Sequence, residues 1–159
     1  MPFDNLSTSP DDAYLAGCMH EEVLTSLTSI PELRVISSTT MQRIDESGLP
    51  VTDIGQRLGV SHVLEGSVRR LNDRVRITAQ LIDAKSDRHL WAENFDRTMT
   101  DLFEVQSEIA LAIAAQLRIE LSTATTDAVT EVTAVDPRAY QLFLRASDEI
   151  RSHRGAGDR

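Results

Sequence analysis

The sequence predicts an α/β protein built as a two-layer sandwich, in which a mixed sheet carries helices mainly on one face. Along residues 62–97, apolar residues alternate with polar ones, which is typical of strands with one dry and one wet face. Along residues 11–29 and 101–121, apolar residues recur at helical spacing. With 159 residues, of which 41% are hydrophobic, the chain is long enough to bury a core without disulfides.

The first third of the chain is predicted to hold the end of a strand, two helices and one short strand. Residues 1–3 are interpreted as the end of a strand that runs into a turn-rich loop. The helix at residues 11–29 has acidic residues at its start and ends before a proline. Two β-branched residues in the segment 33–37 predict a strand, and residues 50–59 predict a short helix that ends at Gly59.

The middle of the chain predicts a three-stranded antiparallel meander. Its strands are residues 62–71, 75–81 and 89–97, which are joined by two polar turns. Gly66 lies inside the first of these strands and is expected to mark a bulge or a close packing contact. The helix at residues 101–121 follows the meander.

Composition divides the chain into three parts. Residues 1–121 hold the predicted α/β domain. Residues 122–135 are rich in Thr, Ser, Ala and Asp and lack an apolar period, so we expect a linker. Residues 136–159 are predicted to hold one amphipathic helix, with no partner in its own segment, followed by a disordered polar tail.

Net charge excludes some classes of partner. The chain has 25 acidic against 16 basic residues and a formal charge of -9, which argues against a dedicated binder of nucleic-acid phosphates or of an anionic membrane surface. No apolar run is long enough for a membrane span, and no signal peptide is expected. Cys18 is the single cysteine, which excludes an internal disulfide.

Chemical motifs give no candidate for a catalytic, cofactor-binding or metal-binding residue. The four histidines, His20, His62, His89 and His153, lack the spacing of a metal site, and Cys18 and His20 are two residues apart on a predicted helix. Neither a nucleophile elbow nor a glycine-rich phosphate loop is present. We therefore expect no enzyme and no cofactor. A small hydrolase or metal enzyme built from the scattered acids and histidines stays as a further alternative.

Four arginines around the turn of the first hairpin are the one local departure from the acidic background: Arg69, Arg70, Arg74 and Arg76. Such a cluster can bind an anionic partner and is our candidate interaction patch. The other interpretation is that these arginines pair with nearby acids and protect an exposed hairpin from aggregation.

A DNA-binding alternative depends on residues 54–61, from Ile54 to Ser61. This stretch resembles the turn of a helix-turn-helix, with the following hairpin as a wing. That fold requires a recognition helix next, whereas residues 62–70 predict a strand.

Six blocks together resemble the TolB amino-terminal-like domain. In chain order they are residues 2–7 (PFDNLS), 33–37 (LRVIS), 54–60 (IGQRLGV), 63–70 (VLEGSVRR), 75–83 (VRITAQLID) and 90–97 (LWAENFDR). The resemblance spans about residues 1–121, and residues 136–145 look like the entry into a tetratricopeptide repeat. Members of the resembled family usually have an apolar strand that leads into the first block.

The resemblance implies a non-catalytic sensory or protein-interaction module of a bacterial signal-transduction protein. In that family the module accompanies an adenylate or guanylate cyclase domain, a winged-helix domain or a kinase, so any cyclase domain would lie outside this chain. The expected partners are other domains of the parent protein or separate proteins, and nucleic acid is not expected. The compartment would be periplasmic if a transmembrane helix precedes the module in its parent, and cytoplasmic otherwise.

Overall fold

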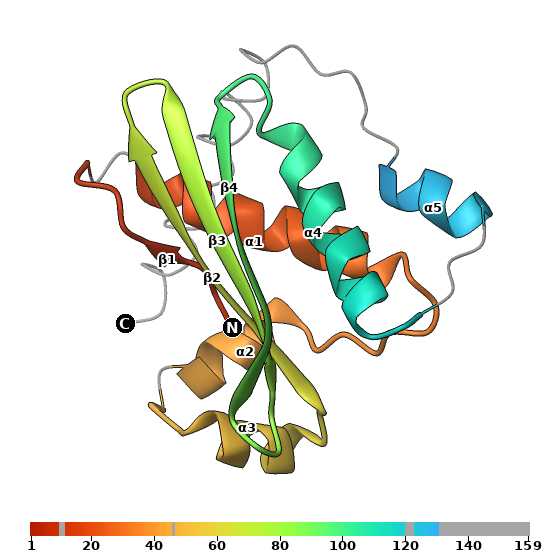
Figure 1. Ribbon diagram of the computed structural model, residues 1–159. Helices are drawn as coiled ribbons and strands as arrows, with labels where there is room; N and C mark the ends of the chain where they lie inside the picture. The colour runs from red at the N-terminus through yellow and green to blue at the C-terminus, as the bar shows by residue number, and fades with distance from the viewer. Residues whose placement is uncertain (10–11, 46, 120–122, 131–159) are drawn as a thin grey trace.

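A computed structural model describes residues 1–9, 12–45, 47–119 and 123–130, and the structural statements below concern these residues. Figure 1 shows their arrangement. The elements follow one another as β1 (Asp4–Asn5), α1 (Ala13–Thr28), α2 (Ser38–Asp45), α3 (Val51–Leu58), β2 (His62–Leu71), β3 (Arg74–Asp83), β4 (Arg88–Thr98), α4 (Phe103–Gln116) and α5 (Thr123–Thr130).

The strands form one mixed sheet in the order β1-β2-β3-β4. β1 runs parallel to β2, whereas β2, β3 and β4 are antiparallel neighbours, so the predicted mixed sheet with its meander is confirmed. The β2–β3 turn is tight because Asn72 has a φ of 57°, the left-handed conformation that two-residue hairpin loops need at their first central position. Ile77 pairs with Val68 on one side and Phe95 on the other, which places three apolar side chains in one row.

Helices α1 and α4 cover one face of the sheet (Figure 1). The side chains of β3 that point to this face are buried along the whole strand. The residues that α1 and α4 contribute to the core are spaced three or four apart, and this spacing is the helical periodicity seen in the sequence. The buried helical residues include Leu15, Met19, Val23 and Leu27 of α1 and Val105, Ile109 and Ile113 of α4. None of the described helices is long and apolar enough to cross a membrane.

A second apolar cluster lies at the end of the sheet where β2 begins, and α2 and α3 cover it (Figure 1). Ile54 of α3 packs there with Val63 and Ala84. A glycine is needed at position 55, because a Cβ atom there would lie 2.7 Å from the Cβ of Ala84. As the sequence predicts, α3 ends at Gly59 in the left-handed conformation, with a φ of 63°.

The first seven residues run along the edge of β2. In β1, Asp4 lies opposite Ser67 and Asn5 opposite Val68. Phe3 lies over Gly66, where an added Cβ would be 2.7 Å from two carbons of the ring. The predicted close packing at Gly66 is confirmed, and it brings the start of the chain onto the middle of the sheet.

The strand predicted at residues 33–37 is wrong. These residues pair with no strand of the described chain, and α2 begins directly after them at Ser38. β-Branched residues favour an extended backbone, but a strand also needs a neighbour with free N–H and C=O groups. α2 itself was not predicted, because it is a polar helix that buries a single residue, Met41.

Part of the segment predicted as a linker, residues 122–135, is helical, because α5 lies within it. Val129 of α5 is buried, and its carbonyl oxygen accepts a hydrogen bond of 2.6 Å from the Ser107 hydroxyl of α4. α4 ends at Gln116 rather than at residue 121, since Arg118 adopts a left-handed φ of 56°. The helix and tail expected at residues 136–159 lie outside the described residues.

Candidate interaction surfaces

The candidate patch of four arginines is divided between the two faces of the β2–β3 hairpin. Side chains alternate along a strand, so neighbouring Arg69 and Arg70 point to opposite faces. Arg69 lies directly opposite Arg76, and both are on the face that α1 and α4 leave uncovered, the outer face. Arg74 shares that face, because it is two residues from Arg76 on the same strand.

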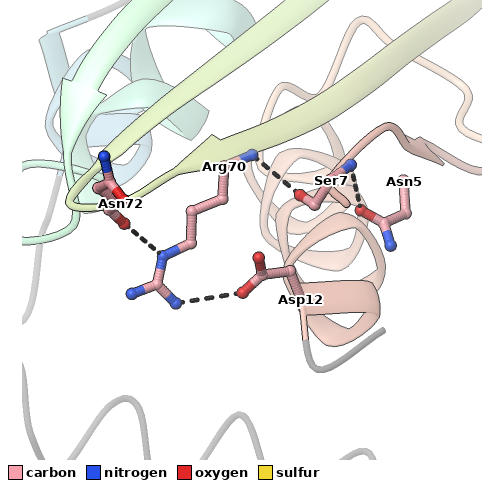
Figure 2. Close-up of polar contacts among 5 residues, drawn as sticks. All are labelled: Asn5, Ser7, Asp12, Arg70 and Asn72. Atoms are coloured by element: carbon pink, nitrogen blue, oxygen red, sulfur yellow. Dashed lines mark hydrogen bonds and ion pairs between the residues drawn. The ribbon is translucent and has the colours of Figure 1, made fainter. Parts of the chain in front are cut away.

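Arg70 ties the hairpin to the start of the chain, as Figure 2 shows. Its Nη1 atom lies 3.2 Å from Oδ1 of Asp12, and its Nε atom donates a 2.8 Å hydrogen bond to the carbonyl oxygen of Asn72. The Arg70 backbone N–H donates to the Ser7 hydroxyl at 2.9 Å, and the Ser7 N–H donates to Oδ1 of Asn5 at 3.0 Å. Arg70 is therefore a structural residue, as the pairing interpretation of the cluster expects.

Arg76 forms an ion pair with an acidic residue on the neighbouring strand. Its Nε and Nη2 atoms donate to the two carboxylate oxygens of Asp96 at 2.8 and 2.9 Å. This two-pronged geometry is the one that the planar guanidinium group favours. The hydrogen bond from Arg76 holds the pKa of Asp96 below its ordinary value.

The remaining two arginines flank an exposed leucine. Leu71 is 71% exposed and lies on the outer face between Arg69 and Arg74, which are also exposed. Neither arginine makes an ion pair within the described part of the chain. Arg69 instead faces Arg76, a like charge. We call Arg69, Leu71 and Arg74 the hairpin-tip surface: two positive charges around one apolar side chain.

A groove of about 370 Å³ lies between the two apolar clusters. One wall is formed by α1 and the end of α4, with Leu27 and Ile113, and the other by Met41 and Ile54 of the second cluster. Its remaining borders are the segment 33–36 and the first residues of β2. Local sequence patterns do not predict this groove, because its walls come from elements that are far apart along the chain.

The histidines and the cysteine form no metal site in the described residues. No group of three His, Cys, Asp or Glu side chains that could hold an ion is found there. The His20 ring packs edge-on against Phe3, with centroids 5.8 Å apart. Cys18 is half-buried and packs against the main core, as expected of a small apolar residue. His153 lies outside the described residues.

The structural premise of the helix-turn-helix alternative is wrong. α3 and Gly59 are followed by β2, a ten-residue strand, where that fold requires a recognition helix. Two of these strand residues, Val63 and Val68, are buried in apolar clusters. Residues 54–61 therefore serve to cover the second cluster.

Residues 1–112 match a family described as HilA/YgeH-like transcriptional regulator, second domain. The chain belongs to this family. A curated relative of this family member, from Rhizobium meliloti (strain 1021), is named "Putative adenylate cyclase 3" and is 37% identical over 150 residues. The match covers 94% of this chain and 26% of the relative, so the chain spans about a quarter of the relative's length.

Solved structures show that this HilA/YgeH-like domain has the TolB-like fold expected from the resemblance. The crystal structure of TolB from Acinetobacter baumannii matches 72% of this chain and 27% of that chain, with a TM-score of 0.52 and 15% identity. The lipoprotein GNA1162 from Neisseria meningitidis matches 77% of this chain and 96% of that chain, with a TM-score of 0.50 and 15% identity. At this identity the likeness shows the fold alone.

Proposed function

We propose that this chain is a non-catalytic interaction module of a bacterial signalling protein. The proposal rests on the finding that similar domains occur in proteins named for two different activities, transcriptional regulation and cyclic nucleotide synthesis. Its family is named for the second domain of a transcriptional regulator, and its curated relative is named for a cyclase of which the chain spans 26%. A part common to a transcription factor and a cyclase is suited to what both need, which is contact with another domain or protein.

The hairpin-tip surface is the part of the domain that we propose makes this contact. Arginine and large apolar side chains are favoured at the centres of protein interfaces, because they combine buried area with charged hydrogen bonds. Arg69 and Arg74 form no ion pair within the described chain and Leu71 is exposed, so a partner can bind all three without breaking a salt bridge. The charges favour a partner that carries carboxylates around an apolar side chain.

A domain exchange tests the proposal. This chain replaces the matched 150 residues of the Rhizobium meliloti relative, and cyclic AMP formation is measured for the relative, the chimera and the isolated chain. We expect the chimera to keep the output of the relative and the isolated chain to form no cyclic AMP above a blank. Turnover by the isolated chain would contradict a non-catalytic role.

Charge reversal then tests the surface. In the chimera, the pair Arg69→Glu and Arg74→Glu is expected to change the output by about threefold or more, because it replaces attraction to a carboxylate-bearing partner by repulsion. The control pair is Arg43→Glu and Arg57→Glu, which makes the same charge change at exposed positions on α2 and α3. Equal outputs from the two pairs would remove the hairpin tip from the proposal.

A further inference from the structure

β4 forms one end of the sheet, and no strand of the described chain pairs with its outer edge (Figure 1). The Met99 N–H donates to the carbonyl oxygen of Asp73 at 3.2 Å, so in the regular part of β4, residues 91–98, the odd-numbered residues face β3. The N–H and C=O groups of Ala92 and Asn94 therefore point outward. Neither residue makes a backbone hydrogen bond at this edge within the part of the chain that the structure describes.

α4 presents an apolar side next to this edge. Glu108, Leu111 and Ala115 share one side of the helix, because they are three and four residues apart. Glu108 accepts hydrogen bonds of 2.7 and 2.9 Å from Nη2 of Arg97, so this side lies beside β4. Leu111 is only half-buried and Ala115 is exposed, whereas a surface helix normally carries polar residues towards solvent.

Apolar side chains of β4 extend this surface. Leu90 is 36% exposed, and Trp91 is half-buried against the main core, with its ring 6.3 Å from that of Phe95. A strand edge with apolar neighbours pairs readily with another chain unless charges or a proline prevent it. β4 contains no proline, so its charges decide which chain can pair with it.

The charges of β4 suit a second copy of the same strand. Arg88 and His89 lie at its start and Glu93 lies further along; all three are exposed and form no ion pair within the described residues. A strand that pairs with its own copy across a two-fold axis runs antiparallel to it. This direction brings the basic end of each copy towards the acidic part of the other, whereas a parallel direction would align like charges.

We propose that β4 pairs antiparallel with β4 of a second copy of this chain, with the two-fold axis at Ala92. An axis at Glu93 would place the two Glu93 side chains directly opposite each other, and an axis at Asn94 would move them away from the basic ends. With the axis at Ala92, the two sheets become one continuous sheet and the apolar sides of the two α4 helices face each other. The inference does not depend on the proposed signalling role.

Sedimentation velocity of the full chain over a range of concentrations tests for the dimer. Because pairing of one strand and one helix side buries less area than a permanent dimer needs, we expect reversible association with a Kd on the order of 10–100 μM. A chain that stays monomeric at concentrations about tenfold above that range would overturn the proposal.

Two substitutions of Ala92 test the strand edge. Ala92→Pro removes an N–H that points away from β3, so we expect the domain to fold and its association to weaken by about tenfold or more. Ala92→Val keeps the N–H and is expected to associate within about threefold of the parent. Urea unfolding checks that each variant is folded. Equal association of the two variants would contradict pairing through this edge.

Two substitutions on α4 test the same interface without altering the strand. Ala115→Glu places a charge on the apolar side and is expected to weaken association by about tenfold. Gln116→Glu adds the same charge at the next exposed residue, which points away from that side, and is expected to have less than about a twofold effect. If both variants associate like the parent, the helix side is not part of the interface and the proposal fails.

Disulfide trapping locates the axis. In a Cys18→Ser background, which removes the single cysteine, Ala92→Cys is expected to form a covalent dimer with oxidised glutathione, because the two residues lie opposite each other. Thr98→Cys, further along the same strand, is expected to stay monomeric. Trapping through Thr98→Cys, or none through Ala92→Cys at a concentration where the parent is dimeric, would overturn the proposed pairing.

Discussion

The two faces of β3 differ sharply although they belong to the same ten residues. Towards α1 and α4, the side chains of Val75, Ile77 and Ala79 are completely buried. On the outer face, Arg76 and Thr78 bond only to the neighbouring strand β4, through Asp96 and Asn94. Along this part of the strand one face therefore holds the fold together, whereas Arg76 and Thr78 on the other face can be altered with little risk of unfolding.

A pair of substitutions at adjacent positions would give the largest contrast between the faces. Ile77→Ala removes a side chain with 0% exposure and is expected to lower the free energy of unfolding by about 2–5 kcal/mol. Thr78→Ala loses the hydrogen bond of the Thr78 hydroxyl to Asn94 and is expected to cost less than about 1.5 kcal/mol. Urea unfolding of both variants measures the difference, and equal losses would contradict the division between the faces.

A substitution at Gly66 tests whether packing on the face covered by α1 and α4 also fixes the start of the chain. Gly66→Ala adds a Cβ that must displace the Phe3 ring, so we expect a loss of about 1–3 kcal/mol from overpacking. Ser67→Ala, one residue along on the opposite face, is the control and is expected to be near neutral. If urea unfolding finds Gly66→Ala as stable as the parent chain, the Phe3 contact contributes little to stability.

Arg69 and Arg70 allow the two faces of β2 to be compared with the same type of residue at neighbouring positions. Arg70→Ala leaves the Asp12 carboxylate, whose side chain is 12% exposed, without its cation and is expected to cost about 1 kcal/mol, since partial exposure of the pair screens it. Arg69→Ala removes an exposed side chain with no ion pair and is expected to stay within about 0.5 kcal/mol of the parent. Thermal unfolding of both variants compares them directly, and the reverse order would contradict the assigned faces.

The smallest expected effect is the pH dependence of the Arg76–Asp96 pair on the outer face. Because Arg76 lowers the pKa of Asp96 from its ordinary value of 3.8, the ionised carboxyl stabilises the folded state above that value. This contribution is lost as the pH falls from 3.8 through the lower pKa of the folded state. The difference in stability between the parent and Asp96→Asn is therefore expected to shrink on acidification. Urea midpoints at a series of pH values measure it, and a difference that does not change with pH would contradict the pairing.

Periodicity was sufficient to predict the parts of the fold whose side chains pack in a regular pattern. The alternation around Ile77 identified the meander, and the helical spacing around Ile109 identified α4, because both patterns follow from burial of one face. The errors lie where the local pattern and the tertiary contacts disagree. Residues 33–37 have strand composition without a strand partner, and α5 consists largely of threonine and alanine but is held by Val129 and Ser107.

For the candidate surface, the sequence analysis located the cluster of four arginines but did not separate those on one face of the hairpin from those on the other. Alternation along the strand alone could have separated Arg69 from Arg70, since that rule needs no coordinates. The partners Asp12 and Asp96 could not have been found in this way, because they lie 58 and 20 residues away along the chain. The groove depends on the meeting of several distant elements and was likewise beyond local patterns.

The two-residue loop at Asn72 and Asp73 limits how the hairpin tip can evolve. An inserted residue would shift the register that places Leu71 opposite Arg74 and would turn the following side chains to the other face. A substitution changes the chemistry of the tip and leaves the ladder intact. Lineages that descend from this domain are therefore expected to diversify in the identity of the tip residues while they keep the length of the hairpin.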